Sequence, residues 1–169
     1  MEMLPVGVKR DGSYYTNIDW SSHTETDPML WVCNVITDDH ERMGGTYGSN
    51  TFGPVELVLG FFGEKQKVSK IRFYRNVGAD ISILNELARH IKVWYTDDDV
   101  LKILRKAGDP VDAVNWTFAQ EIDVLPEAGW LDITLDKPFE AKHVRFTLVD
   151  NSTPDIEWTE MNEIRMYGE

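Results

Sequence analysis

The sequence predicts an all-β fold, an antiparallel β-sandwich of about eight main strands. Short runs rich in β-branched and aromatic residues follow one another, separated by turn-forming residues. Within these runs apolar and polar residues alternate, as Ile71 and Phe73 do around Arg72, which is typical of strands with one buried face. The runs comprise residues 55–59, 70–74, 91–95, 117–122, 130–135, 143–149 and 163–167.

The segments outside these runs are less regular. Residues 1–54 are polar and rich in Gly, Pro and Asp, which indicates loops with short strands. Apolar positions in 81–90 fall on one helical face and predict at most two helical turns. Residues 101–107 are consistent with a helical turn or with part of a long hairpin connection. The closing strand, 163–167, is expected to pair near the start of the chain, which would bring the termini together.

Composition restricts the class of protein. The chain has 169 residues, which fits one domain spanning 1–169, and a net charge of −12. This charge repels phosphate backbones and anionic lipids, so neither nucleic acid nor a membrane surface is an expected partner. The single cysteine, Cys33, excludes an intrachain disulfide and is expected to be a buried structural thiol. No apolar run is long enough for a membrane span, and the first ten residues do not resemble a signal peptide. The chain is therefore expected to be intracellular or a domain of a longer secreted protein.

Catalytic patterns are not evident in the sequence. No nucleophile elbow or phosphate-binding glycine loop is present, and the four histidines lack the spacing of a helical zinc site. His143 is expected to be a half-exposed structural residue. A non-catalytic domain is therefore the prediction.

Five segments in order resemble the discoidin-like, or coagulation factor 5/8 type C, domains. They are Leu59-Gly60 with the strand that follows, the strand 91–98, Trp116, the segment 130–149 with its Ala-x-x-Val-Arg core, and the closing segment 159–168. The resemblance is clearest over 54–168. It implies a jelly roll like that of galactose-binding domains, which bacteria use chiefly as carbohydrate-binding modules of glycoside hydrolases.

In many members of this family a loop near the N-terminus and a glutamate of the closing strand hold a structural Ca²⁺ ion. The positions that would carry this role are Asp38, Asp39 and Glu163, with Thr46 as a further candidate. Ca²⁺ takes oxygen ligands from carboxylates and carbonyls, which these residues supply. The alternative is that Asp38 and Asp39 form only a solvated turn.

Sugar recognition requires an aromatic face for C–H groups and polar side chains for hydroxyls. Arg75 and Asn76 follow the strand 70–74, where galactose-binding relatives carry an Arg and an Asn, and Asn85 is an alternative to Asn76. Trp158 and Glu157 precede the closing strand. Trp20 and Tyr47 are further candidates, whereas Trp94, Trp116 and Trp130 are expected in the core.

The resulting prediction is a monomeric, sugar-binding module of a secreted or cell-surface bacterial protein. The alternative is a protein-interaction or adhesion domain of the same fold, possibly an intracellular one.

Overall fold

The computed structural model describes residues 1–10, 14–16, 19–23, 35, 47–49, 54–75, 87–124, 127, 129–151 and 158–169. At 8–10, 14–16, 47–49 and 75 it describes the backbone alone. Among these residues, no helix is long and apolar enough to cross a membrane.

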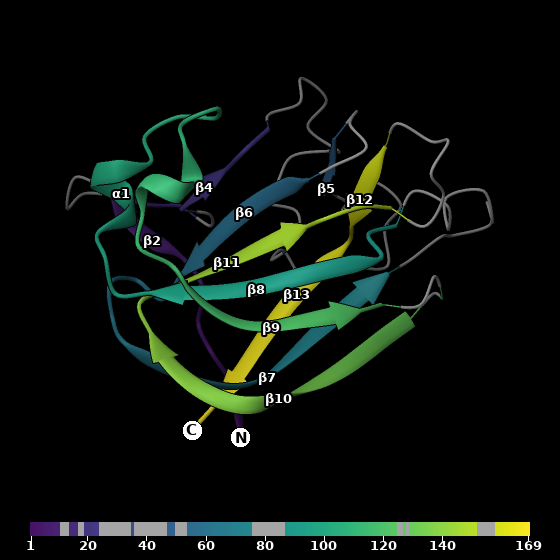
Figure 1. Cartoon of the computed structure of the whole chain (residues 1–169). Coiled ribbons are helices and arrows are strands. Elements are labelled where there is room, and N and C mark those ends of the chain that lie inside the picture. The colour runs from purple at the N-terminus through teal and green to yellow at the C-terminus, as the bar shows by residue number, and fades with distance from the viewer. Residues whose placement is uncertain are drawn as a thin grey trace.

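Two antiparallel sheets face each other, which confirms the predicted sandwich (Figure 1). One sheet has the order β1-β13-β7-β10 and the other the order β4-β6-β11-β8-β9. The first sheet consists of β1 (Glu2–Met3), β13 (Glu163–Gly168), β7 (Gln66–Arg75) and β10 (Gly129–Ala141). The second consists of β4 (Trp20–Ser21), β6 (Val55–Gly60), β11 (His143–Leu148), β8 (His90–Thr96) and β9 (Thr117–Asp123).

Smaller elements complete the described part of the chain. β2 (Val8–Arg10) pairs with β3 (Tyr14–Thr16), and β5 (Tyr47–Ser49) pairs with β12 (Thr159–Met161). The connection between β8 and β9 contains the helix α1 (Val100–Ile103) and the 3-10 turn η4 (Val111–Ala113). The seven predicted runs coincide with β6, β7, β8, β9, β10, β11 and β13.

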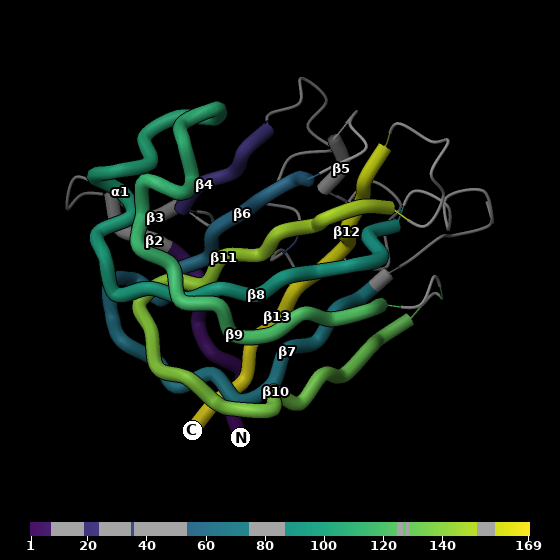
Figure 2. The backbone as a smooth tube through the Cα atoms, in the orientation of Figure 1, coloured from purple at the N-terminus to yellow at the C-terminus, as the bar shows by residue number. Residues whose placement is uncertain are grey.

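The strand β10 is long and bends along the bottom of the sandwich (Figure 2). Its pairing with β7 shifts register between Thr134 and Phe139, and Pro138 lies within this interval. Proline cannot donate a ladder hydrogen bond, so an irregular stretch of strand is where it is tolerated.

The core lies between the sheets because alternate side chains of each strand point inward. Leu57, Val93 and Phe146 from one sheet pack with Phe73 and Ile164 from the other. Phe73 and Phe146 meet edge to face, with ring centroids 6.2 Å apart. A second cluster on the outer face of the five-stranded sheet is covered by α1 and η4. Its buried members are Trp20, Val58, Val100, Leu104 and Val114.

The predicted meeting of the termini is also confirmed. β1 pairs antiparallel with β13, with Glu2 opposite Gly168 and Met3 opposite Tyr167. The helix predicted in 81–90 is wrong for its described part, because Leu87 and Ala88 form β-bridges to Glu160 and Asn151 and His90 begins β8. Residues 81–86 lie outside the described residues. The helical turn considered for 101–107 is present one residue earlier, as α1.

Candidate functional site

Several predicted site residues come together at one end of the sandwich, which we call the loop end (Figure 1). β7 ends at Arg75, which lies opposite Gly129 at the start of β10. β13 begins at this end with Glu163, opposite Tyr74 of β7. Trp158 directly precedes β12, and β12 holds Tyr47 of β5 opposite Met161. Strand pairing therefore places Arg75, Tyr47, Trp158 and Glu163 at the loop end.

Trp158 is half-buried at the loop end, and hydrogen bonds fix its position. Its indole Nε1 donates to Oε1 of Glu160 at 2.6 Å, and its carbonyl oxygen accepts from Nδ2 of Asn151 at 2.7 Å. The indole N–H is therefore bonded inside the protein and is not available to a ligand.

Other predicted residues lie outside the described part of the chain. These are Asp38, Asp39, Thr46, Asn76, Asn85 and Glu157, and also Cys33. For Arg75 and Tyr47 only the backbone position is described.

Trp20 does not lie with the other candidates. It is 5% exposed, packs in the cluster beneath α1, and donates its Nε1–H to the carbonyl of Lys106 at 2.8 Å. The prediction that Trp20 stacks on a ligand is therefore wrong, because the connection between β8 and β9 covers its ring.

The tryptophans predicted for the core are not fully buried. Trp94 and Trp130 lie half-buried on the outer faces of the two sheets, and each contacts a guanidinium group. Arg145 lies 4.9 Å from the ring centroid of Trp94, and Arg72 lies 4.4 Å from that of Trp130. Trp116 is also half-buried, and its ring centroid lies 5.6 Å from the same guanidinium of Arg145. The attraction between each guanidinium and the ring face stabilises these large side chains in their half-buried positions.

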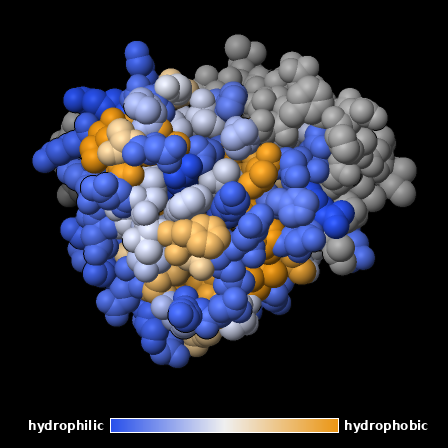
Figure 3. All heavy atoms as spheres, viewed as in Figure 1, coloured by the Kyte–Doolittle hydropathy of each residue, from blue (hydrophilic) through white to orange (hydrophobic). Residues whose placement is uncertain are grey.

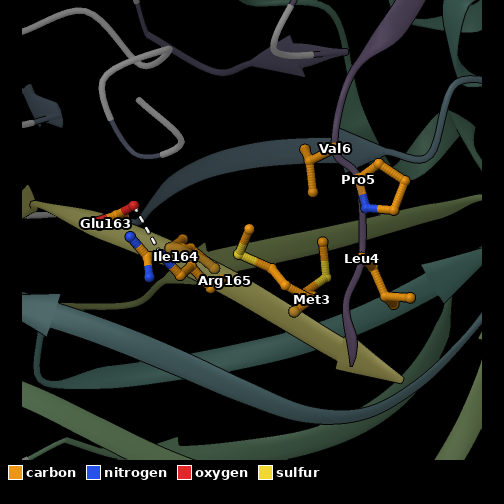
Figure 4. Close-up of a pocket in the computed structure, with 8 residues that line it drawn as sticks. Met3, Leu4, Pro5, Val6, Glu163, Ile164 and Arg165 are labelled. Carbon is orange, nitrogen blue, oxygen red and sulfur yellow. Dashed lines mark hydrogen bonds and ion pairs between the residues drawn. The ribbon is translucent and has the colours of Figure 1, made fainter. Parts of the chain in front are cut away.

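Glu163 is the described member of the predicted calcium ligands. It is 2% exposed, and its Oε1 accepts a hydrogen bond from Nε of Arg165 at 3.0 Å (Figure 4). Both residues border a small cavity of about 120 Å³ beneath the N-terminal segment Met3 to Val6. Carboxylate oxygens such as those of Glu163 are ligands that Ca²⁺ prefers. Within the described ranges, no group of three or more His, Cys, Asp or Glu residues is arranged to hold a metal.

A network of buried charges on the five-stranded sheet was missed by the sequence analysis. Arg145 of β11 donates from Nε to Oε1 of Glu56 at 2.8 Å and also from Nη2 to the same oxygen. Thr147 donates its hydroxyl to this oxygen at 2.6 Å, and Trp94 donates to Thr147 at 3.1 Å. The available signal was a Glu in β6 and an Arg in β11, each at a position that alternates with core residues.

His143 was predicted to be half-exposed, and this is wrong. The residue is 6% exposed, and its Nδ1 is bonded to Oδ2 of Asp19, which is itself 1% exposed. Asp19 lies against Gly60 of the neighbouring strand, where a Cβ atom would come within 2.5 Å of the carboxylate. A residue without a Cβ atom is therefore needed at position 60 to leave room for the buried pair of Asp19 and His143.

Part of this sheet face is open to solvent, with an apolar cluster over β8 and β9 among polar side chains (Figure 3). Phe118 is 50% exposed and meets Trp94 edge to face, with ring centroids 5.1 Å apart. Phe118 is thus an exposed aromatic residue that lies away from the loop end and from Trp158.

No protein-family model matches the chain, and no curated protein matches it. Solved structures do match. The family 32 carbohydrate-binding module of Streptococcus pneumoniae EndoD has a TM-score of 0.67 at 15% identity, covering 90% of this chain and 94% of the module. The family 32 module of Clostridium perfringens NanJ, in complex with galactose, has a TM-score of 0.62 at 12% identity, covering 87% and 90%. A module of AlyQ, in complex with 4,5-unsaturated mannuronic acid, has a TM-score of 0.60 at 10% identity, covering 99% and 97%. These likenesses confirm the discoidin-like fold.

Proposed function

We propose that this chain is a non-catalytic carbohydrate-binding module that binds sugar through the loop end. The observation that carries the proposal is the convergence of the strand ends bearing Arg75, Tyr47 and Trp158. Residues on loops beyond strand ends can surround a ligand, which a flat sheet face cannot do. The likeness to sugar-binding modules over nine-tenths of the chain supports the same function.

The residues at the loop end supply the two interactions that sugar recognition needs. The Trp158 ring offers an apolar face for pyranose C–H groups, and the Arg75 guanidinium can donate two parallel hydrogen bonds to neighbouring hydroxyls. Asn76 and Glu157 add hydroxyl partners to the proposed site.

The charge of the chain narrows the class of sugar. Among the structural neighbours, one is in complex with galactose and another with an unsaturated uronic acid. A net charge of −12 repels a polyanionic polysaccharide, so we propose a glycan without acidic groups. In a larger bacterial protein at the cell surface or outside the cell, such a module would keep that protein bound to the glycan.

A glycan array screen with the purified chain tests this proposal. We expect binding to one or more neutral glycans with a dissociation constant on the order of 10⁻⁴ to 10⁻³ M. The competing function is a protein-interaction or adhesion domain of the same fold. That function gains support if no glycan binds at millimolar concentration while one partner protein is captured reproducibly.

Replacing Trp158 by alanine is expected to weaken glycan binding at least tenfold, which corresponds to about 1.4 kcal/mol, because the stacking surface is lost. Arg75→Ala should weaken it as well. Calorimetric titration with the glycan found on the array measures both effects. Phe118→Ala is the matched control, since it removes an exposed aromatic ring from the sheet face and should leave affinity unchanged. Full affinity in folded Trp158→Ala and Arg75→Ala variants would exclude the proposed site.

We also propose a structural Ca²⁺ ion, held by Glu163 together with Asp38 and Asp39. The burial of the Glu163 carboxylate supports this role. An ion that binds the folded state raises the melting temperature as its concentration passes the dissociation constant. We therefore expect excess chelator to lower the melting temperature of the wild type, and to have a smaller effect on Glu163→Gln. An unchanged melting curve with chelator would refute the ion.

A further inference from the structure

A hollow of about 200 Å³ lies at the end of the sandwich opposite the loop end. The turn between β6 and β7, the end of β8, the start of α1 and the residues joining β10 to β11 enclose it. The lining residues are Phe62, Gly63, Asp97, Asp98, Asp99, Leu101, Lys142 and His143. The proposed loop-end site contributes none of them.

A buried histidine forms part of the wall of the hollow. The carboxylate of Asp19 can only accept hydrogen bonds, so the His143 ring donates Nδ1–H to it, and Nε2 is the ring atom left for a second partner. Nε2 of His143 forms no hydrogen bond with any described residue. It is also not one of the buried, unpaired side-chain atoms of the described residues, so it is accessible to solvent. A polar nitrogen in such a position requires a partner from water or a ligand. The Asp19 carboxylate fixes the orientation of the ring.

Carboxylates dominate the charge around the hollow. Among the described residues that line it, Asp97, Asp98 and Asp99 stand against one cationic residue, Lys142. A hydrogen bond from Lys65, 2.7 Å away, lowers the pKa of Asp97, so this carboxyl is ionised at neutral pH. Asp98 accepts a hydrogen bond from the backbone N–H of Asn115 at 3.1 Å.

The remaining charges nearby do not cancel this excess. Lys102 lies 3.5 Å from Asp99, but its side chain is 84% exposed, and an ion pair of this kind contributes little. Asp19 adds another carboxylate behind His143. Among the described residues, the four carboxylates of Asp19, Asp97, Asp98 and Asp99 therefore outnumber the three ammonium groups of Lys65, Lys102 and Lys142.

Phe62 provides an apolar wall. It is 37% exposed and has a φ of 56°, in the left-handed region that non-glycine residues rarely occupy. Its ring packs on Gly7, where a Cβ atom would come within 2.3 Å of it, and its backbone N–H donates to the carbonyl of Gly7 at 2.7 Å. Strained residues held in this way cluster at ligand sites.

From this arrangement we infer that the hollow binds one hexosamine, a pyranose that carries a protonated amine. The volume is below the range of pockets for drug-sized ligands and suits a single sugar ring. The carboxylates attract the ammonium group, His143 Nε2 pairs with a hydroxyl, which can donate or accept, and Phe62 packs against C–H groups. This site is independent of the glycan site at the loop end.

Nuclear magnetic resonance titration of the ¹⁵N-labelled chain with glucosamine hydrochloride at neutral pH tests the inference. We expect saturable shifts of the Gly63 and Asp98 amides with a dissociation constant on the order of 10⁻³ M. N-acetylglucosamine should bind at least fivefold more weakly because it lacks the charge. Ammonium chloride at the same ionic strength should give no saturable shift.

Variants assign the site and separate it from the loop end. Asp99→Asn and Phe62→Ala should each weaken glucosamine binding at least threefold, whereas Phe118→Ala and Trp158→Ala should leave it unchanged. Shifts confined to the loop end, shifts reproduced by ammonium chloride, or no shifts at all would overturn the inference. None of these results bears on the array-selected glycan, whose binding depends on Trp158.

Discussion

Replacing Arg145 by alanine is expected to lower the free energy of unfolding by about 3–5 kcal/mol, because it leaves the Glu56 carboxylate buried without its cation. Glu56 is 8% exposed and Arg145 is 6% exposed. The guanidinium also contacts Trp94 and Trp116 and donates to Asp112 at 3.1 Å, so its removal opens a gap in this layer. For a chain of this length, the loss corresponds to a decrease in melting temperature of roughly 10 °C.

Urea denaturation and thermal melting measure this effect, and a double variant controls for its cause. In Glu56→Leu/Arg145→Met both charges are replaced by apolar side chains of similar size, a change that is often nearly neutral. Most of the lost stability should therefore return in the double variant. A loss below 1 kcal/mol in Arg145→Ala would contradict the role given to the buried pair.

The second large effect is expected for Gly60→Ala, with a loss of about 3 kcal/mol. The added methyl group would lie 2.5 Å from the Asp19 carboxylate, closer than such contacts allow. Relief requires Asp19 to move, which separates it from His143 and leaves two buried polar groups poorly paired. Overpacking alone costs about 1–3 kcal/mol, and the disturbed pair adds to it.

A double-mutant cycle isolates this mechanism. Asp19→Ala alone is destabilising because it leaves the buried Nδ1 of His143 without its acceptor. Adding Gly60→Ala to that variant should cost much less than adding it to the wild type, since the carboxylate that obstructs the methyl group is gone. Equal costs in the two backgrounds would show that the contact between Gly60 and Asp19 is not responsible.

The strands of the sandwich could be predicted because each carries its own signal. Alternation of apolar and polar residues in 70–74 and 91–95 depends on the pleat of a strand, which is a local property. The short strands before residue 54 have no such pattern. β4 is defined by its pairing with β6, with Trp20 opposite Val58, and this depends on residues far apart in the sequence.

The positions of some predicted site residues could be inferred for the same reason. Arg75 ends a strongly patterned strand, so its place at a sheet end follows from the local sequence. Trp20 also lies beside polar residues in the sequence, but the connection between β8 and β9 covers it, and no feature near Trp20 indicates this cover. The pair of Asp19 and His143 joins residues separated by 124 positions, and neither residue signals the other.

The pairing of β1 with β13 also determines which end of the domain remains exposed when the chain is attached to a support through a terminus. Both chain ends emerge side by side at one end of β13, and Glu163 lies at its other end, about 17 Å away for a strand of six residues. A linker, tag or solid support fixed to either terminus thus leaves the loop end pointing outward and accessible to a large glycan. The hollow beside His143 is lined by the turn between β6 and β7, and Gly168 lies against Lys67 just after that turn. An attachment at a terminus would therefore lie nearer to the hollow than to the loop end. Immobilised protein is consequently suited to testing the proposed loop-end site, and the proposed hexosamine site is best tested with the chain free in solution.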